Sequence, residues 1–440
     1  MKLTTWFSLL TSFFFLTAAS AAPAYKLDLH SAGEAALKSN LLTLLAQAKS
    51  GAAKGRVLQA ASRLLPHILL NLQQSRVYKE NLASMGFSSF GVIGPYNSFD
   101  GRIQLVEDIF DLSALDGFRA EEVNNDIAGL DEELAAKQVR SAVSLAYLEA
   151  VSAQEELKAA KADLSLAKQL LKLSRHQNLA GLATGINVAR FETREAEDEA
   201  RCLQALMNWR KACIELNRIV GLQLDTRLEL MDTLKFMSED IFSVDAEINL
   251  AVHNRTELKI AAQRIKYRGF KVDEASAQRL PTIGLSGDYG LGGDRPNGSL
   301  RSVGEMGVVL KMPIFDGRAI DGDVEEAKSN VHQAKLTFDD MNRQVEEDVR
   351  LAQQALSISV KQLKADRKVF ALAARELAMS RDLFAADIGD NLEVANAQTT
   401  LARARQQYVA ALFQYNAARV NFYSALGDIE GFSLIAKNRR

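Results

Sequence analysis

The placement of proline constrains this chain more than any other feature of its sequence. Beyond Pro23, the prolines fall in two short tracts, residues 66–95 and 281–313, whereas residues 96–280 and 314–440 contain none. Because a proline in a helix interior costs about 3 kcal/mol, only the proline-free tracts permit very long helices. The two proline-containing tracts are predicted to form strands and loops.

Apolar residues recur every seven positions in both proline-free tracts, which is typical of coiled coils. The second tract has Val349, Leu356, Leu363, Phe370, Leu377 and Phe384 at this spacing; 206 residues earlier stand Val143, Ala150, Leu157, Leu164, Leu171 and Asn178. Helices over about 114–178 and 320–384 would each be near 100 Å long, at about 1.5 Å per residue. A turn and a return helix follow each, so the sequence predicts two helical hairpins, about 114–221 and 320–427.

The proline-containing tracts alternate apolar and polar residues, as strands do. Ile283, Leu285, Tyr289 and Leu291 alternate with small or polar residues, and Met306, Val308 and Leu310 do the same further along. Strands are predicted at about 281–291 and 303–315, and less clearly at about 64–77 and 101–111. Loops are expected near 79–100 and 292–300.

The two halves of the chain show an internal duplication. Ile109-Phe110-Asp111 recurs as Ile314-Phe315-Asp316, an offset of 205 residues. The duplication divides the chain into a first repeat, 22–227, and a second repeat, 228–428, with residues 429–440 as a C-terminal tail.

The first residues have the pattern of a secretory signal peptide, residues 1–21, with a basic Lys2, an apolar stretch and small residues through Ala21. An uncleaved membrane anchor is the alternative, but the apolar stretch is shorter than the roughly 20 residues that spanning requires. No later segment is apolar for long enough, so a membrane-crossing form of this chain must use strands.

Charge and reactive residues exclude other functions. A net charge of -2 offers no basic surplus for nucleic acid. Cys202 and Cys213 stand eleven residues apart in a helical stretch, too far apart to bond. The five histidines are scattered, so no metal site and no cofactor are predicted, and the acidic pairs Asp339-Asp340 and Glu346-Glu347 lie among basic residues. We do not expect an enzyme.

Four strands cannot close a barrel, since the smallest known have about eight, so strands from several copies must combine. The order of signal, short helix, strand pair and long helical hairpin, followed by the same series again, resembles the TolC-like outer-membrane efflux and secretion channels. The resemblance covers roughly residues 25–428. Its most specific segments are 61–68 with the copy near Pro281, 313–317, 389–398 and 425–427.

The resemblance implies an α-helical barrel continuing a transmembrane β-barrel, in which a homotrimer contributes twelve strands. It also implies location in the cell outer membrane, in contact with its lipid and extending into the periplasm. The expected partners are a periplasmic adaptor (membrane fusion) protein and an inner-membrane pump of the RND or ABC type. The expected function is the exit duct of a tripartite efflux system for drugs or other toxic small molecules.

The resemblance also supplies candidate site residues. Glu393 and Asn396 match the positions that pinch the periplasmic end of family channels, although an acid is common where Asn396 stands. The turns containing Gly181, Gly185, Asp387 and Gly389 are candidates for adaptor docking. A ring of Glu393 carboxylates would favour cations, but a solvated carboxylate at a helix start is an equally simple interpretation.

Two alternatives remain open. The same duct could serve a type I protein secretion system, because cargo choice would lie in the pump. A periplasmic coiled-coil scaffold is the alternative of another class, and it predicts a protein that needs no detergent.

Overall fold

The computed structural model describes residues 24–81, 92–181, 184–237, 243–298, 300–386 and 391–434. The predicted signal peptide therefore lies outside the described residues. Two series of elements follow the same order along the chain. The first is α2 (Leu41–Ser62), β2 (His67–Val77), β5 (Tyr96–Phe110), α3 (Leu112–Leu179) and α4 (Gly185–Val220). The second is α6 (Thr256–Ala277), β7 (Thr282–Gly293), β8 (Arg301–Lys311), α7 (Ala319–Ala385) and α8 (Asn391–Ala425).

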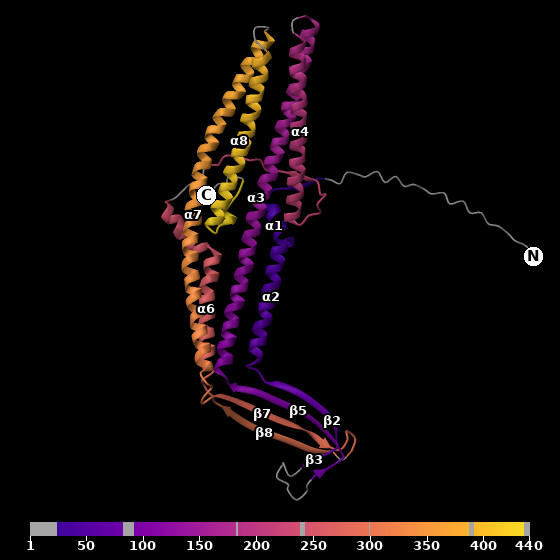
Figure 1. Cartoon of the computed structure of the whole chain (residues 1–440), viewed down its shortest axis with the longest axis vertical. Helices are drawn as coiled ribbons and strands as arrows, with labels where there is room; N and C mark the ends of the chain where they lie inside the picture. The colour runs from indigo at the N-terminus through magenta and orange to yellow at the C-terminus, as the bar shows by residue number, and fades with distance from the viewer. Residues whose placement is uncertain are drawn as a thin grey trace, which may run out of the picture.

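The molecule is elongated, with helices along most of its length and a sheet at one end (Figure 1). The long helices α3 and α7 comprise 68 and 67 residues, which corresponds to about 100 Å each. Helices α4 and α8 run back along the upper halves of α3 and α7, whereas α2 and α6 pack beside the lower halves of the same two helices. None of the helices in the described ranges combines the length and the hydropathy that crossing a membrane requires.

Smaller elements gather near mid-height of the helices. They are β1 (Tyr25–Leu27), α1 (Leu29–Ser39), β6 (Leu228–Leu230), α5 (Val244–Asn254) and the short 3-10 helix η2 (Ile429–Gly431). Strands β1 and β6 form a parallel pair, and the buried hydroxyl of Tyr147 contacts the carbonyl of Leu27 (3.0 Å) and the carboxylate of Asp232 (2.9 Å). Burial raises the pKa of this phenol. Phe432 and Leu434, in the predicted tail, are buried in the same core.

The four long strands form one antiparallel sheet in the order β2-β5-β7-β8. Beyond the end of this sheet that lies away from the helices, β3 (Glu80–Asn81) pairs with β4 (Val92–Ile93). The prediction of long helices with four antiparallel strands is thus confirmed. Strands β2 and β8 are the edges of this sheet, and in the described residues each pairs with a single neighbour in it.

The seven-residue pattern explains the helix packing. Val143, Val349 and Leu356 are fully buried, and Leu363 is nearly so. Ala153, Ala167 and Ser174, which follow members of this pattern in α3 by three residues, are buried as well. Large and small side chains thus alternate where α3 meets its return helix, which lets the helices approach closely.

The two strand-to-helix junctions differ in local structure. In the first, β5 ends at Phe110 and Asp111 caps α3 by accepting a hydrogen bond from the Ala114 amide (2.9 Å). In the second, β8 ends earlier, and Gly317 and Arg318 both adopt positive φ, of 69° and 73°. A non-glycine residue in this region carries strain of order 1 kcal/mol, so the second junction is held in an unusual conformation.

Candidate functional site

The register of the sheet separates an apolar face from a polar one. One face carries large apolar side chains from all four strands: Ile68, Leu70, Leu72, Ile103, Leu105, Leu285, Tyr289, Leu291, Met306, Val308 and Leu310. These are largely exposed; Ile68 is 71% and Met306 83% accessible. Alternation of this kind is what a strand between lipid and a polar interior requires. The faces predicted for the second strand pair match this register.

The opposite face carries charges and amides. Arg102 lies between two carboxylates, with Nε 2.6 Å from Asp100 and Nη1 3.0 Å from Asp288. Asn71 donates a hydrogen bond to Gln104 (2.7 Å) on the same face. Gly290 pairs with Arg102, and a Cβ there would lie only 2.6 Å from the Arg102 Cα, so the strands approach closely where the arginine crosses. The polar face is thus held together by contacts between strands.

The candidate gate residues lie at the helical end, opposite the sheet. Glu393 and Asn396 occupy the first turns of α8, and both side chains are exposed. Beneath them Val394 and Ala397 are buried against α3, α4 and α7, where Phe191 and Phe384 lie 6.3 Å apart between ring centroids. The apolar cluster fixes α8, and the two polar residues project from its other faces.

The candidate docking turns connect the long helices to their return helices. Gly181 is exposed with a φ of 76°, which favours glycine, and Gly185 is the exposed first residue of α4. Asp387 and Gly389 lie outside the described residues. The structure brings both helical hairpins to the same end of the molecule (Figure 1).

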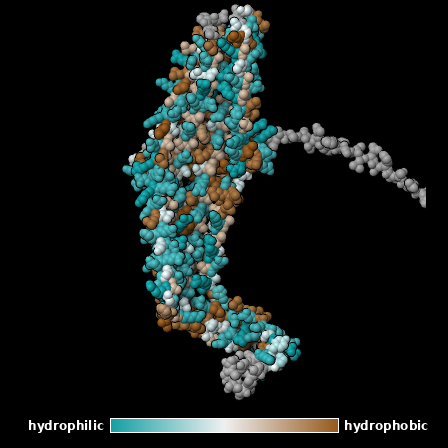
Figure 2. Space-filling view, in the orientation of Figure 1, coloured by the Kyte–Doolittle hydropathy of each residue, from teal (hydrophilic) through white to brown (hydrophobic). Residues whose placement is uncertain are grey.

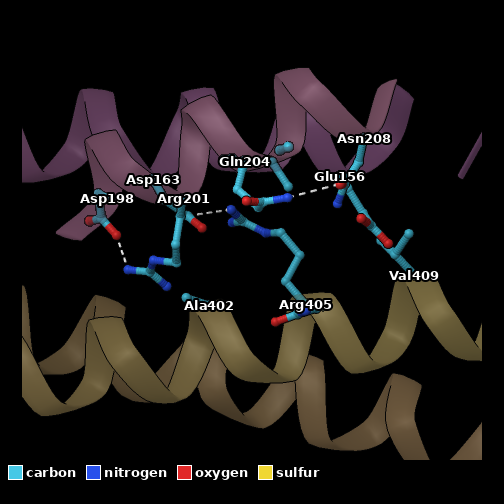
Figure 3. A pocket seen from close by; sticks show the side chains of 13 residues that line it. Glu156, Asp163, Asp198, Arg201, Gln204, Asn208, Ala402, Arg405 and Val409 are labelled. Carbon is cyan, nitrogen blue, oxygen red and sulfur yellow. Dashed lines mark hydrogen bonds and ion pairs between the residues drawn. The ribbon is translucent and has the colours of Figure 1, made fainter. Parts of the chain in front are cut away.

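A cluster of buried charges joins the first hairpin to α8 below this tip (Figure 3). Asp198 of α4 is 1% exposed; it pairs with Arg201 and Arg194 (3.2 Å) and accepts a hydrogen bond from Gln398 of α8 (3.3 Å). Burial lowers the pKa of the Arg194 guanidinium. The cluster ties α4 to α8 by polar contacts rather than by the apolar seam.

A second pair extends this cluster from α3 to α8. Arg405 Nη1 donates to Asp163 Oδ1 at 2.5 Å, and both side chains line a pocket of about 160 Å³. Burial raises the pKa of Glu156, which lines the same pocket. These contacts link α3 and α4 of the first hairpin to α8 of the second.

Sequence reasoning missed this cluster, although a signal was present. In α4 the positions Phe191, Asp198, Ala205 and Ala212 are spaced by seven residues, and all four are buried. A carboxylate at an inward heptad position needs a buried partner. Asp198 could therefore have been singled out as a site of polar contact between helices.

Cys202 and Cys213 are free thiols on α4, and burial raises the pKa of Cys213 to about 12. Within the described residues, no group of three or more metal-ligating side chains comes together.

The fold and part of the sequence match known proteins. Residues 248–428 match the family model described as "Outer membrane efflux protein". The alkaline protease secretion protein AprF of Pseudomonas aeruginosa is 22% identical over 87% of this chain and 82% of its own length. The outer membrane protein TolC of Escherichia coli is also 22% identical, over 88% of this chain and 79% of its length.

Solved structures share the fold. The CmeC outer membrane channel of Campylobacter jejuni superposes with a TM-score of 0.79 at 18% identity, covering 93% of this chain and 87% of that one. The outer membrane protein VceC of Vibrio cholerae gives 0.77 at 17% identity, covering 91% and 96%. Taken with the register of the strands and the paired helical hairpins, these matches show that the chain has the fold of the outer membrane channels and that residues 248–428 match the outer membrane efflux protein family.

Proposed function

We propose that this protein is the exit duct of a tripartite efflux system, which passes drugs or other toxic small molecules out of the cell. Members of the family span the outer membrane, extend into the periplasm and have no enzymatic activity, and the same location and lack of catalysis hold for this chain. The proposal rests on one observation: a sheet with one apolar and one polar face is joined to helices of about 100 Å.

Closure into a homotrimer is supported by the internal duplication. Helix α6 packs against both α3 and α7, whereas α2, its counterpart, packs on α3 and has no comparable second neighbour in the described chain. Leu45 and Leu58 of α2 are 50% and 72% exposed. In the proposed assembly, α7 of a second copy packs beside α2, just as α7 of the same chain packs beside α6.

The strands support the same closure. Because β5 pairs with β7 between the two repeats, edge strand β8 is expected to pair with β2 of the next copy. Three copies would contribute twelve strands, with the apolar face toward lipid and the polar face lining the lumen. Channels of this family typically form trimers within tripartite efflux systems.

At the other end, Glu393 and Asn396 would surround the periplasmic opening. A ring of Glu393 carboxylates would attract cations and bind divalent ions. The turns at Gly181, Gly185, Asp387 and Gly389 would meet the periplasmic adaptor, which links the duct to an inner-membrane pump of the RND or ABC type.

A second candidate function, the duct of a type I protein secretion system, is favoured by a specific observation. Two of the similar proteins are named for secretion of proteases, AprF and the proteases secretion protein PrtF of Dickeya chrysanthemi. The same duct geometry serves either cargo.

Deletion of the gene separates these functions. The efflux proposal predicts that the deletion strain becomes sensitive to toxic small molecules and regains resistance when the intact gene is returned. Unchanged sensitivity, with loss of a secreted protein from the medium, would contradict efflux and support secretion.

A further inference from the structure

The two strand hairpins of the sheet have the same internal register. In the first hairpin Ile68 of β2 pairs with Leu105 of β5, and in the second Ile283 of β7 pairs with Leu310 of β8. Counterparts therefore lie 215 residues apart in β2 and β7, and 205 residues apart in β5 and β8. With these two offsets, every residue of one hairpin has a defined counterpart in the other.

Sequence motifs at the ends of the strands give the same two offsets without reference to the pairing. The Leu-Pro dipeptide before β2 begins at Leu65 and recurs 215 residues later at Leu280, before β7. The Ile-Phe-Asp motif begins at Ile109 and recurs 205 residues later at Ile314, after β8. Sequence and register thus agree on the correspondence between the hairpins.

This correspondence specifies how the sheet continues beyond its edges. Within the chain, β5 ends the first hairpin and pairs with β7, which begins the second. The equivalent contact beyond the edge joins β8 to β2 of another copy. Leu105 pairs with Gly287 across the internal contact. The two offsets convert this pair into Leu310 of β8 and Leu72 of β2.

We propose that β8 pairs with β2 of a second copy in the register that these offsets specify. On the polar face of the sheet the partners, with the β8 residue first, are Gly307 and Ser75, Val309 and Gln73, and Lys311 and Asn71. The inference deepens the proposed function and rests on it, because it names the residues through which the copies of the duct join.

Both faces of the sheet stay continuous in this register. Exposed apolar residues gather along the sheet where it meets the helices (Figure 2). Leu310 and Leu72, 64% and 67% exposed, lie on the apolar face of their strands and become neighbours across the new contact. A slip of one residue would instead set Leu310 beside Gln73, because successive side chains of a strand point to opposite faces.

A proline marks the end of the proposed pairing. Within the chain, the register of β5 and β7 shifts between Asp108 and Phe110, where β5 bulges. The counterpart of Asp108, 205 residues later, is Pro313. Proline has no amide hydrogen to donate and is found in sheets at edges and bulges. The ladder between β8 and β2 can therefore run up to Pro313 and break there, as the internal ladder does.

The polar groups of two copies meet in the same register. Asn71 Nδ2 donates a hydrogen bond to Gln104 of its own chain (2.7 Å). The exposed Lys311 of the neighbouring copy comes to lie opposite Asn71, whose side-chain oxygen can accept a hydrogen bond from the ammonium group. The polar surface thus continues across the boundary between copies.

The helices show the same relation above the sheet. Asp163 of α3 and Val409 of α8 line one pocket, where the two repeats of a chain meet. Their counterparts at the helical offset of 206 residues are Val369 of α7 and Leu203 of α4, which are 46% and 62% exposed. When α4 of the next copy lies against α7 as α8 lies against α3, these two apolar side chains face each other and leave water.

Disulfide cross-linking measures this register. In a background with Cys202→Ala and Cys213→Ala, the double variant Val309→Cys/Gln73→Cys is extracted in detergent and oxidised with copper phenanthroline. Residues directly opposite in an antiparallel pair have Cα atoms about 4.5 to 5.5 Å apart, which a disulfide spans. Diagonal neighbours lie about 7 to 8 Å apart. Covalent dimers and trimers on a non-reducing gel are the expected result.

Two shifted variants and one reference complete the test. Val309→Cys/Asn71→Cys and Val309→Cys/Ser75→Cys correspond to slips of two residues in either direction, and they should link chains at least about tenfold more slowly. The reference is Gln104→Cys/Asp288→Cys, the equivalent pair inside the chain. Its disulfide leaves the mass of the chain unchanged and protects both thiols from alkylation.

The outcomes separate this inference from the function proposed above. Fastest linkage in the Gln73 variant supports the register. Equal or faster linkage in either shifted variant, or no linkage between chains in a particle of trimer mass, overturns the register and leaves the duct. A protein that is monomeric by mass in detergent, while the reference disulfide forms, contradicts the duct and the register together.

Discussion

The two repeats share their elements but differ where helices and strands end. Val143 and Val349 stand at corresponding positions, 206 residues apart, and both are fully buried in the seam. At the same offset, the buried Asp198 of the first repeat corresponds to the buried Ala404 of the second. The exposed Glu393 of the second repeat corresponds to Asn187 of the first. The common fold therefore requires only the apolar seam, and the charged positions are free to diverge.

This difference assigns separate tasks to the repeats. The first carries the buried Asp198 and the partly buried Asp163, whose carboxylates bond to α8 of the second. The second carries the exposed Glu393 near its tip. We infer that polar contacts from the first hairpin help to position the second.

The largest effect is expected from Asp198→Ala, which gives the first repeat the residue that the second has at Ala404. It would remove the buried carboxylate beside Arg194, which is itself buried, and leave only the exposed Glu197 at 3.5 Å. Loss of one partner of a buried ion pair costs about 3 to 5 kcal/mol, so the helical end should unfold at lower temperature. Thermal unfolding followed by circular dichroism, with proteolysis near residue 181, would measure the change.

A second substitution sharpens this prediction. In Asp198→Ala/Arg194→Thr the uncompensated guanidinium is removed as well, and the pair matches Thr400 and Ala404 of the second repeat. Part of the lost stability should return, because the two sites are coupled. Additive destabilisation would show that Asp198 and Arg194 do not stabilise the protein as a pair.

Smaller effects are expected at the two glycines that end the return helices. Gly221 and Gly427 have φ values of 81° and 75°, so alanine is strained at either position. A Cβ at 427 would lie 3.0 Å from the backbone carbon of Asn254, whereas at 221 it would lie 2.6 Å from the Cβ of Ser39, which no side-chain rotation can move. We expect a loss of about 2 kcal/mol for Gly221→Ala and about 1 kcal/mol for Gly427→Ala. The reverse order, measured by urea unfolding, would contradict this account of the close contacts.

The smallest effect on stability, and a distinct one on conductance, is expected from Glu393→Ala. The side chain is exposed, so unfolding should change by less than about 0.5 kcal/mol. In planar bilayers, block of the channel by divalent cations should weaken, because the carboxylate ring is gone. Asn187→Ala, at the corresponding position of the first repeat, serves as the control. Unchanged block in Glu393→Ala would remove this residue from the gate.

The sequence predicted features that depend on regular spacing. Seven-residue periodicity located the long helices, and alternation located the strand faces, because each side-chain period reflects one backbone geometry. The cluster around Asp198 depends on which helices meet, and periodicity within one helix does not specify that. Positive φ at Arg318 could not be foreseen either, since glycine or asparagine is the usual residue there.

The central claim is that several copies of the chain form one duct in the outer membrane. The most direct test extracts the protein from isolated outer membranes in detergent and measures the protein mass of the particle by light scattering. The account predicts a detergent-dependent particle of three protomers. A monomer that remains in solution without detergent would contradict it and would favour a periplasmic coiled-coil scaffold.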